Sequence, residues 1–261
     1  WIDKDELESV EKSPELKATL NELNQRTSWK TYFFQFLTQM PVEYNIKPQR
    51  KAWVTFSLVA LNTLIFALYF FNSEAFGFAI EFFAMTPSDI SEGNEVWTLL
   101  TCMFLHGSIM HLLGNMYFLY VVGDNLEDVL GHKRFLIWYL VCGLIASLSS
   151  YLVSPTSAIP SVGASGAIAG LFGMYLMWFR HASLTFMIII YQKKLSAAWF
   201  FAIWLIINIS GALSGPDGID YGAHIGGFVA GLLIGYFLKN KILEQNPIIR
   251  LLNQSEAQLK R

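Results

Sequence analysis

The segment PSVGASGAIAGLFGMYLMWF, residues 160–179, is the stretch on which the interpretation of the whole chain depends. It is 20 residues long without a charged side chain, roughly the length of helix that spans the hydrocarbon core of a bilayer. Near its start Ser165 lies among small residues, between Gly163-Ala164 and Gly166. Polar groups are costly at membrane depth, so this serine predicts either a hydrogen bond back to a helix carbonyl or a chemical task.

The composition places the chain among membrane proteins. Hydrophobic residues make up 54% of 261 residues, which is above the range of ordinary soluble domains. No basic stripe predicts nucleic-acid binding, and the two cysteines, Cys102 and Cys142, lie in apolar segments where a thiol behaves as a small hydrophobe. The acidic first dozen residues show no leader pattern, so targeting is expected to come from the membrane segments.

Periodicity and charge-free length predict an all-α, polytopic bundle of six transmembrane helices. Residues 73–99 are too charged to span and too aromatic for a solvated loop, which predicts a loop lying in the membrane interface. The apolar run 184–191 is too short to span. The predicted helices are residues 52–71, residues 97–122, two helices within 135–179 that a turn at 154–161 separates, residues 196–213 and residues 221–239.

The positions of lysine and arginine predict the orientation. All of them lie in the N-terminal region, the 2–3 and 4–5 loops or the tail, and short loops rich in these residues stay cytoplasmic. We therefore expect three parts: a cytoplasmic region over residues 1–50, a six-helix domain over 51–239 and a cytoplasmic tail over 240–261. In the first part a helix is predicted from Ser13, and an amphipathic helix over 29–40 is expected either to pack on protein or to lie in the membrane interface.

This topology brings polar residues from three helices to one depth, near the outer leaflet. They are Ser165 at the start of helix 4, His224 at the start of helix 6, and His106, His111 and Asn115 on helix 2. Below the first two, small residues form a face on each helix that permits a close approach of backbones, so the serine hydroxyl and the imidazole are expected within reach of each other. The packing residues are Gly166, Gly170 and Gly173 on helix 4 and Gly227, Gly231 and Gly235 on helix 6.

A serine nucleophile needs donors for the oxyanion that forms on attack. The amides at a helix N-terminus supply such donors, and His111 and Asn115, four residues apart, share a helix face and can add two side chains. Simpler interpretations remain for each residue alone, because histidine and asparagine also join membrane helices by hydrogen bonds. A metal site is disfavoured, since His106 and His111 are five apart with no carboxylate between them.

At these residues the sequence closely resembles the rhomboid intramembrane serine proteases. The resemblance covers about residues 52–239 and rests on Gly163-Ala-Ser-Gly166, on Ala223-His-Ile-Gly-Gly227 and on the segment from His106 to Asn115. It implies a Ser165–His224 dyad without an acid, supported by an oxyanion pocket. The residues assigned to that pocket and its support are His111, Asn115, Gly163, Ala164 and His106.

The sequence departs from that family at two positions. Thr98 follows Trp97 where some members have arginine, and Ala169 lies where others have an aromatic ring one turn after the serine. Neither departure affects the dyad. Asp217 and Asp220 follow helix 5 and could orient His224, but their position favours a solvated, helix-capping role.

The predicted function is an intramembrane serine endopeptidase that cleaves transmembrane or membrane-anchored proteins in the lipid bilayer, with no cofactor, metal or nucleic acid. The resemblance implies a multi-pass plasma membrane protein, the inner membrane in a bacterium, with a site that opens toward the outer leaflet. One alternative is a catalytically silent relative that binds membrane clients. A transporter or channel is disfavoured because no predicted span contains a buried acid.

Overall fold

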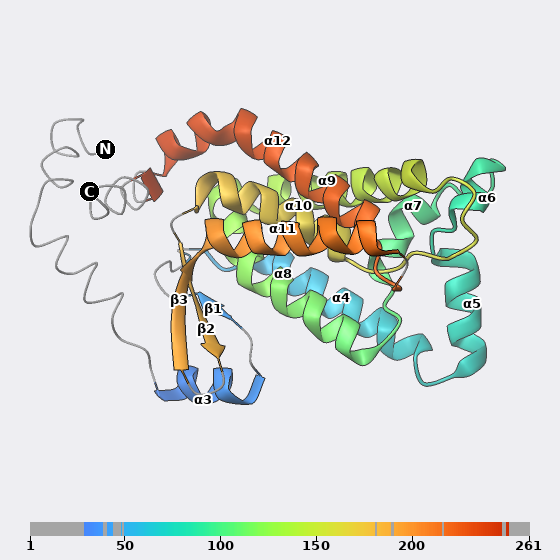
Figure 1. The fold of residues 1–261 in the computed structure, drawn as a ribbon, viewed down its shortest axis with the longest axis horizontal. Coiled ribbons are helices and arrows are strands. Elements are labelled where there is room, and N and C mark those ends of the chain that lie inside the picture. Colours follow the sequence, from blue (N-terminus) through green and yellow to red (C-terminus); the bar gives the residue numbers. More distant parts are fainter. Residues whose placement is uncertain are drawn as a thin grey trace, which may run out of the picture.

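Most of the long helices of the computed structural model run side by side roughly along its long axis, and a small sheet with one short helix lies toward one end (Figure 1). The structure describes residues 29–38, 41–43, 48, 50–180, 182–188, 191–215, 217–246 and 249–250. The helix predicted from Ser13 lies outside these residues. The helices are α3 (Trp29–Thr38), α4 (Trp53–Tyr69), α5 (Ser73–Phe83), α6 (Pro87–Ser91), α7 (Thr98–Thr101), the 3-10 helix η1 (Cys102–Phe104), α8 (Ile109–Leu130), α9 (His132–Val153), α10 (Ser165–Trp178), α11 (Ala197–Ser214) and α12 (Tyr221–Gln245).

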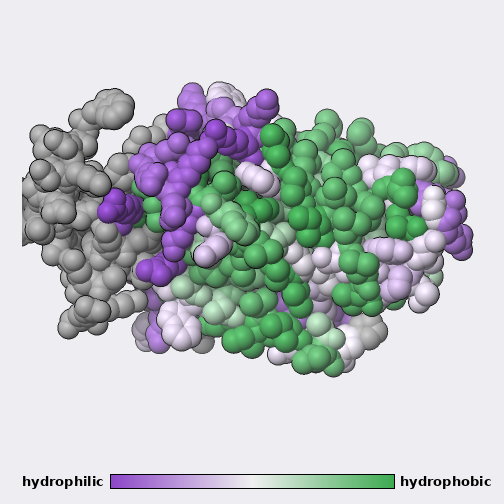
Figure 2. Space-filling model, turned by 90° about the horizontal axis from the view of Figure 1, so that it is seen from above, coloured by the Kyte–Doolittle hydropathy of each residue, from purple (hydrophilic) through white to green (hydrophobic). Residues whose placement is uncertain are grey.

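Several of these helices are long and apolar enough to cross a membrane. In the described part of the chain α9, α11 and α12 meet this description singly, and Thr98–Phe104 with Ile109–Leu130 meets it as a pair bent by 94°. The shorter apolar helices α4 and α10 have 17 and 14 residues. Hydrophobic side chains cover the middle of the face in Figure 2, between more polar ends. The chain is thus a multi-pass helical membrane protein, and the count of six crossings remains a prediction.

The fourth predicted helix is α10 and begins at Ser165, its expected start. Residues before it are extended: Met85 and Ser161 exchange both backbone hydrogen bonds, at 3.1 and 2.8 Å. Gly163 has a φ of +127°, a conformation that side chains with a Cβ rarely adopt, and its amide donates to the carbonyl of Cys102 at 2.9 Å. This loop brings the first turn of α10 into the interior of the bundle.

The helix predicted over 97–122 is broken. After η1 the chain turns sharply, and Ser108 caps α8 by accepting a hydrogen bond from the amide of His111 at 3.1 Å. The turn is held by Tyr69 of α4, whose hydroxyl accepts from the amide of His106 at 2.7 Å and donates to its carbonyl at 2.8 Å. Helix α8 then continues through Gly123 to Leu130, beyond its predicted end.

Two other regions differ from the sequence-based prediction. The predicted interfacial loop 73–99 contains the helices α5 and α6. The prediction of an all-α fold is wrong in the 4–5 loop, because the short apolar run is β2 (Ser183–Ile188), paired antiparallel with β3 (Tyr191–Ser196) and with β1 (Val42–Glu43). Six residues are enough for a strand in a hairpin, although they are too few to span as a helix.

The amphipathic helix α3 packs on this sheet. The Nε2 of Gln35 donates to the carbonyl of Thr185 at 2.5 Å, and the ring of Phe34 stacks on that of Tyr117 with centroids 6.3 Å apart. Trp29 and Phe33 are exposed. One side of the helix thus packs on protein, as one of the two alternatives predicted, and its contact with lipid remains a prediction.

The closest contact between helices is that of α10 with α12, and glycines make it possible. A Cβ at Gly231 would lie 2.6 Å from the carbonyl carbon of Gly170, and a Cβ at Gly227 would lie 3.0 Å from that of Gly166. In each case the obstacle is backbone, which no side-chain rotation can remove. The close approach of the two helices at these positions depends on the missing Cβ atoms, as expected for the packing role of these four glycines, which stays a prediction.

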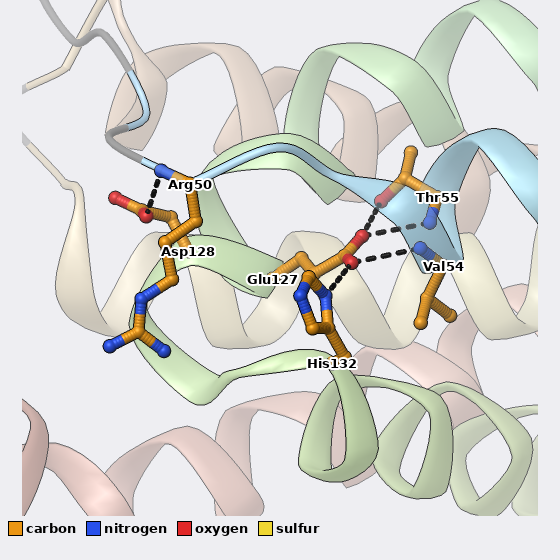
Figure 3. A network of polar contacts seen from close by, with 6 residues as sticks. All are labelled: Arg50, Val54, Thr55, Glu127, Asp128 and His132. Atoms are coloured by element: carbon orange, nitrogen blue, oxygen red, sulfur yellow. Dashed lines mark hydrogen bonds and ion pairs between the residues drawn. The ribbon is translucent and has the colours of Figure 1, made fainter.

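A buried carboxylate joins the start of α4 to the end of α8 (Figure 3). Glu127, 1% exposed, accepts from the amides of Val54 and Thr55 at 2.8 Å each and from the hydroxyl of Thr55 at 2.7 Å. The Nδ1 of His132 lies 2.5 Å from Oε1 of Glu127, the oxygen that also accepts from the amide of Val54. The amides at the start of a helix lack partners within the helix, so Glu127 satisfies groups that would otherwise be buried and unpaired.

Replacement of Glu127 by alanine is expected to destabilise the protein by about 3 kcal/mol, because two amides and a hydroxyl lose a charged acceptor in a buried place. Glu127→Gln, which keeps one carbonyl oxygen, is expected to lose less. Unfolding in detergent, followed by circular dichroism, measures both. The control is Glu81→Ala, since Glu81 is exposed on α5; equal stability of Glu127→Ala and this control would contradict the assignment.

Candidate active site

The serine predicted as nucleophile is the first residue of α10. The preceding residue, Ala164, is buried and provides no side-chain cap. The first helical hydrogen bond runs from the amide of Ile168 to the carbonyl of Ala164 at 3.0 Å, so the amides before Ile168 have no acceptor one turn earlier in the helix. Ser165 is half-buried. Its hydroxyl thus lies beside amides that are free to bind a negative charge.

His224 lies in the first turn of α12, where Asp220 is the N-cap. One carboxylate oxygen of Asp220 accepts from the amide of Ala223 at 2.9 Å. The other accepts from the hydroxyl of Ser150 on α9 at 2.6 Å and from that of Ser161, in the loop before α10, at 2.5 Å. Asp220 is thus a helix cap, as favoured from the sequence, and it also ties the start of α12 to the loop that leads into Ser165.

Asp217 is exposed and has a different local role. It accepts hydrogen bonds from the hydroxyl of Tyr221 at 2.6 Å and from the amide of Ile219 at 3.1 Å. The bond from Tyr221, followed by that from Ile219, holds the pKa of Asp217 below its usual value. These bonds organise the turn before α12 and do not involve the ring of His224.

The glycine contact places Ser165 and His224 at the same end of the two helices. A Cβ at Gly166, the neighbour of the serine, would lie 3.5 Å from the Cβ of Ala223, the neighbour of the histidine. Among the described residues the hydroxyl of Ser165 makes no hydrogen bond. Catalytic hydrogen bonds are often long before substrate binds, so this geometry is compatible with a dyad without showing one.

His111 lies against the loop that precedes Ser165. A Cβ at Gly163 would be 2.7 Å from the Nε2 of His111 and 3.6 Å from the hydroxyl oxygen of Ser165. Glycine at 163 is therefore required both by its positive φ and by the space that the imidazole occupies. Asn115, 7% exposed, donates one amide hydrogen to the carbonyl of His111 at 2.8 Å, which leaves its second amide hydrogen for another acceptor.

His106 is fully buried behind His111, and their ring centroids are 5.1 Å apart in an edge-to-face arrangement. Neither ring nitrogen of His106 has a hydrogen-bond partner among the described residues. It touches His111 rather than the serine, which supports the predicted supporting role. Over the described ranges no three residues of the types His, Cys, Asp and Glu are grouped to hold a metal ion.

Two residues of α11 that the sequence analysis did not identify contact His224. The Nδ1 of His224 lies 2.7 Å from the Oδ1 of Asn208, and the ring of Trp204 lies against the imidazole with centroids 5.8 Å apart. Trp204 thus provides an aromatic neighbour that Ala169 does not. The sequence contains one indication of this contact, since Asn208 is a polar residue within an apolar span.

The fold and this site define a multi-pass helical membrane protein in which a serine and a histidine begin two helices packed through glycines. The rhomboid domain matches residues 93–241, which is more than half of the chain. The chain therefore belongs to the rhomboid family.

Several curated proteins are similar to it. RHOMBOID-like protein 5 of Arabidopsis thaliana is 37% identical over 147 residues, covering 56% of this chain and 45% of that protein. Rhomboid protease GluP of Bacillus subtilis (strain 168) is 33% identical over 204 residues, covering 74% of this chain and 36% of that protein. RHOMBOID-like protein 2 of Arabidopsis thaliana is 42% identical over 145 residues, covering 56% and 43%. The chain matches less than half the length of each of these three relatives.

Proposed function

We propose that this chain is an intramembrane serine endopeptidase that cleaves transmembrane or membrane-anchored proteins with a Ser165–His224 dyad. The observation that carries the proposal is the contact of α10 with α12, which places Gly166 against Ala223 and thus the serine and the histidine at one level. A contact that served only to pack the two helices would require neither a serine nor a histidine at this level. Membership of a family that includes a protein named Rhomboid protease GluP supports the same reading.

In the proposed reaction the hydroxyl oxygen of Ser165 attacks the carbonyl carbon of the substrate while His224 accepts the hydroxyl proton. The tetrahedral oxyanion binds to the free amides at the start of α10 and to donors from His111 and Asn115. His224 then gives its proton to the leaving amine as the C–N bond breaks. A water molecule, deprotonated by the same histidine, releases the acyl group and restores the serine.

We further propose that the chain crosses the membrane six times, with both ends in the cytoplasm and the site toward the outer leaflet. The 14 residues of α10 cover only about 21 Å. In this arrangement Ser165, its first residue, therefore lies below the bilayer surface. In intact cells a membrane-impermeant maleimide is expected to label Ile219→Cys and not Lys133→Cys. The reverse pattern would contradict the orientation.

A fluorophosphonate probe tests the proposed nucleophile directly. The hydroxyl oxygen of an activated serine forms a bond to phosphorus, and fluoride leaves with the proton taken up by the base. The wild-type protein in detergent is expected to become labelled, and Ser165→Ala is expected to remain unlabelled. A folded wild type that is neither labelled nor active on a transmembrane reporter would favour the client-binding alternative over the protease.

A further inference from the structure

We propose that Asn208 on α11 is a positioning residue for His224, which makes the reacting group a serine–histidine–asparagine relay. The proposal rests on the proposed function, and it adds a third residue from a helix that contains neither member of the dyad. Asn208 is 4% exposed, and its side chain lies in the interior although most of the surrounding α11 surface is apolar and exposed.

The direction of the amide follows from its two hydrogen bonds. The Nδ2 of Asn208 donates to the carbonyl of Trp204, one turn earlier in α11, at 2.7 Å. A carbonyl can only accept, so this contact requires the nitrogen end of the amide. The other end, Oδ1, is therefore the atom that lies 2.7 Å from the Nδ1 of His224.

The amide oxygen in turn determines which imidazole nitrogen carries the proton. An amide oxygen cannot donate, so the Nδ1 of His224 must be the donor in this contact. In the neutral ring the Nε2 is then unprotonated and has a lone pair, as a base for the serine proton requires. If the Nδ1 had no acceptor, the Nε2 could carry the proton instead and the ring could not act as a base through that atom.

The surrounding side chains hold the ring in this orientation. The indole of Trp204 lies against one side at 36° to the imidazole plane, and the ring of Tyr221 meets it nearly edge-on at 89°, with centroids 6.5 Å apart. Trp204 also provides the carbonyl that orients Asn208. The same turn of α11 therefore determines both the tilt of the imidazole and the position of its proton.

The test compares Asn208→Leu, which keeps the approximate volume without an acceptor, with Asn208→Asp, which keeps an acceptor. Asn208→Leu is expected to lower kcat on a transmembrane reporter by about 100-fold, the scale of a misplaced catalytic group, with KM within about twofold. It is also expected to slow fluorophosphonate labelling of Ser165 to the same extent. Asn208→Asp is expected to restore most of both rates.

The matched control is Asn62→Leu. Asn62 is also fully buried in an apolar helix, and its Nδ2 also donates to the carbonyl four residues earlier, that of Leu58, at 2.8 Å, but it lies on α4. It is expected to leave kcat and labelling unchanged, and the thermal midpoint of each leucine variant reports its effect on stability. An equal loss of kcat in the two leucine variants would show a purely structural role and overturn the proposal.

A second measurement does not depend on activity. In protein with ¹⁵N-labelled histidine, the signal of His224 is the one that disappears in His224→Ala. In the wild type this signal is expected to be that of a ring protonated on Nδ1. In Asn208→Leu the ring is not expected to be protonated on Nδ1. A wild-type ring protonated on Nε2 would overturn the positioning role. A wild type that neither cleaves nor labels would overturn the proposed function, and the nitrogen spectrum would still test the hydrogen bond.

Discussion

Replacing Ser165 by alanine is expected to lower cleavage of a transmembrane reporter in liposomes by about 10⁴-fold or more, because α10 has no other serine, threonine or cysteine to form the acyl bond. His224→Ala is expected to have nearly the same effect, since a serine without its base is a weak nucleophile. The double variant is expected to lose little beyond either single one, because the two residues act as a unit.

The control for this prediction is Ser57→Ala, because Ser57 is an exposed serine on the apolar helix α4, outside the site. It is expected to cleave the reporter at the wild-type rate. Circular dichroism and the thermal midpoint of Ser165→Ala and Ser57→Ala are expected to match the wild type, since Ser165 makes no side-chain hydrogen bond among the described residues. Full activity in Ser165→Ala would exclude the proposed mechanism.

Replacing Gly231 by alanine is expected to separate α10 from α12, although alanine is the better helix former. The added Cβ would lie 2.6 Å from the carbonyl carbon of Gly170 and 2.8 Å from its Cα, so one helix backbone must move. Overpacking of a close contact costs about 1–3 kcal/mol, and a shift near 1 Å at a catalytic group costs about 100-fold in rate. Both the unfolding free energy and kcat are expected to fall.

Gly77→Ala on α5 is the matched control for this variant. Within the described part of the chain a Cβ at Gly77 would meet no atom within 4 Å, so the substitution is expected to preserve activity and to keep or raise stability. Near-wild-type activity in Gly231→Ala would show that the helices can separate without loss of the site. It would remove the main structural support for the proposed dyad.

The main helices could be predicted because their apolar length and the charges between them are local properties of the sequence. Helix α4 was predicted over 52–71 and runs from Trp53 to Tyr69. The break before α8 was not predicted, since the turn there is held by Tyr69, 37 residues earlier in the sequence, which bonds to the backbone of His106. The sheet was missed for a similar reason, because β2 pairs with β1 from the N-terminal region.

At the site, the sequence indicated the residue types and the tertiary structure determined their partners. Ser165, His224, His111 and Asn115 are predicted site residues from the sequence, and the glycine faces predicted which two helices pack. Asn208 was not identified. Its spacing to His224 has no meaning until α11 and α12 lie side by side, and only then does one amide oxygen face one ring nitrogen.

The sequence by itself therefore determined that this is a helical membrane protein with a serine at the start of one glycine-faced helix and a histidine at the start of another. Hydrophobic length, charge placement and small-residue spacing are all local patterns, so they can be read without a fold. Only the tertiary structure decided the short α10, the bend before α8, the pairing of β2 with β1 and the bond of Asn208 to His224. Each of these depends on a contact between segments that are distant along the chain.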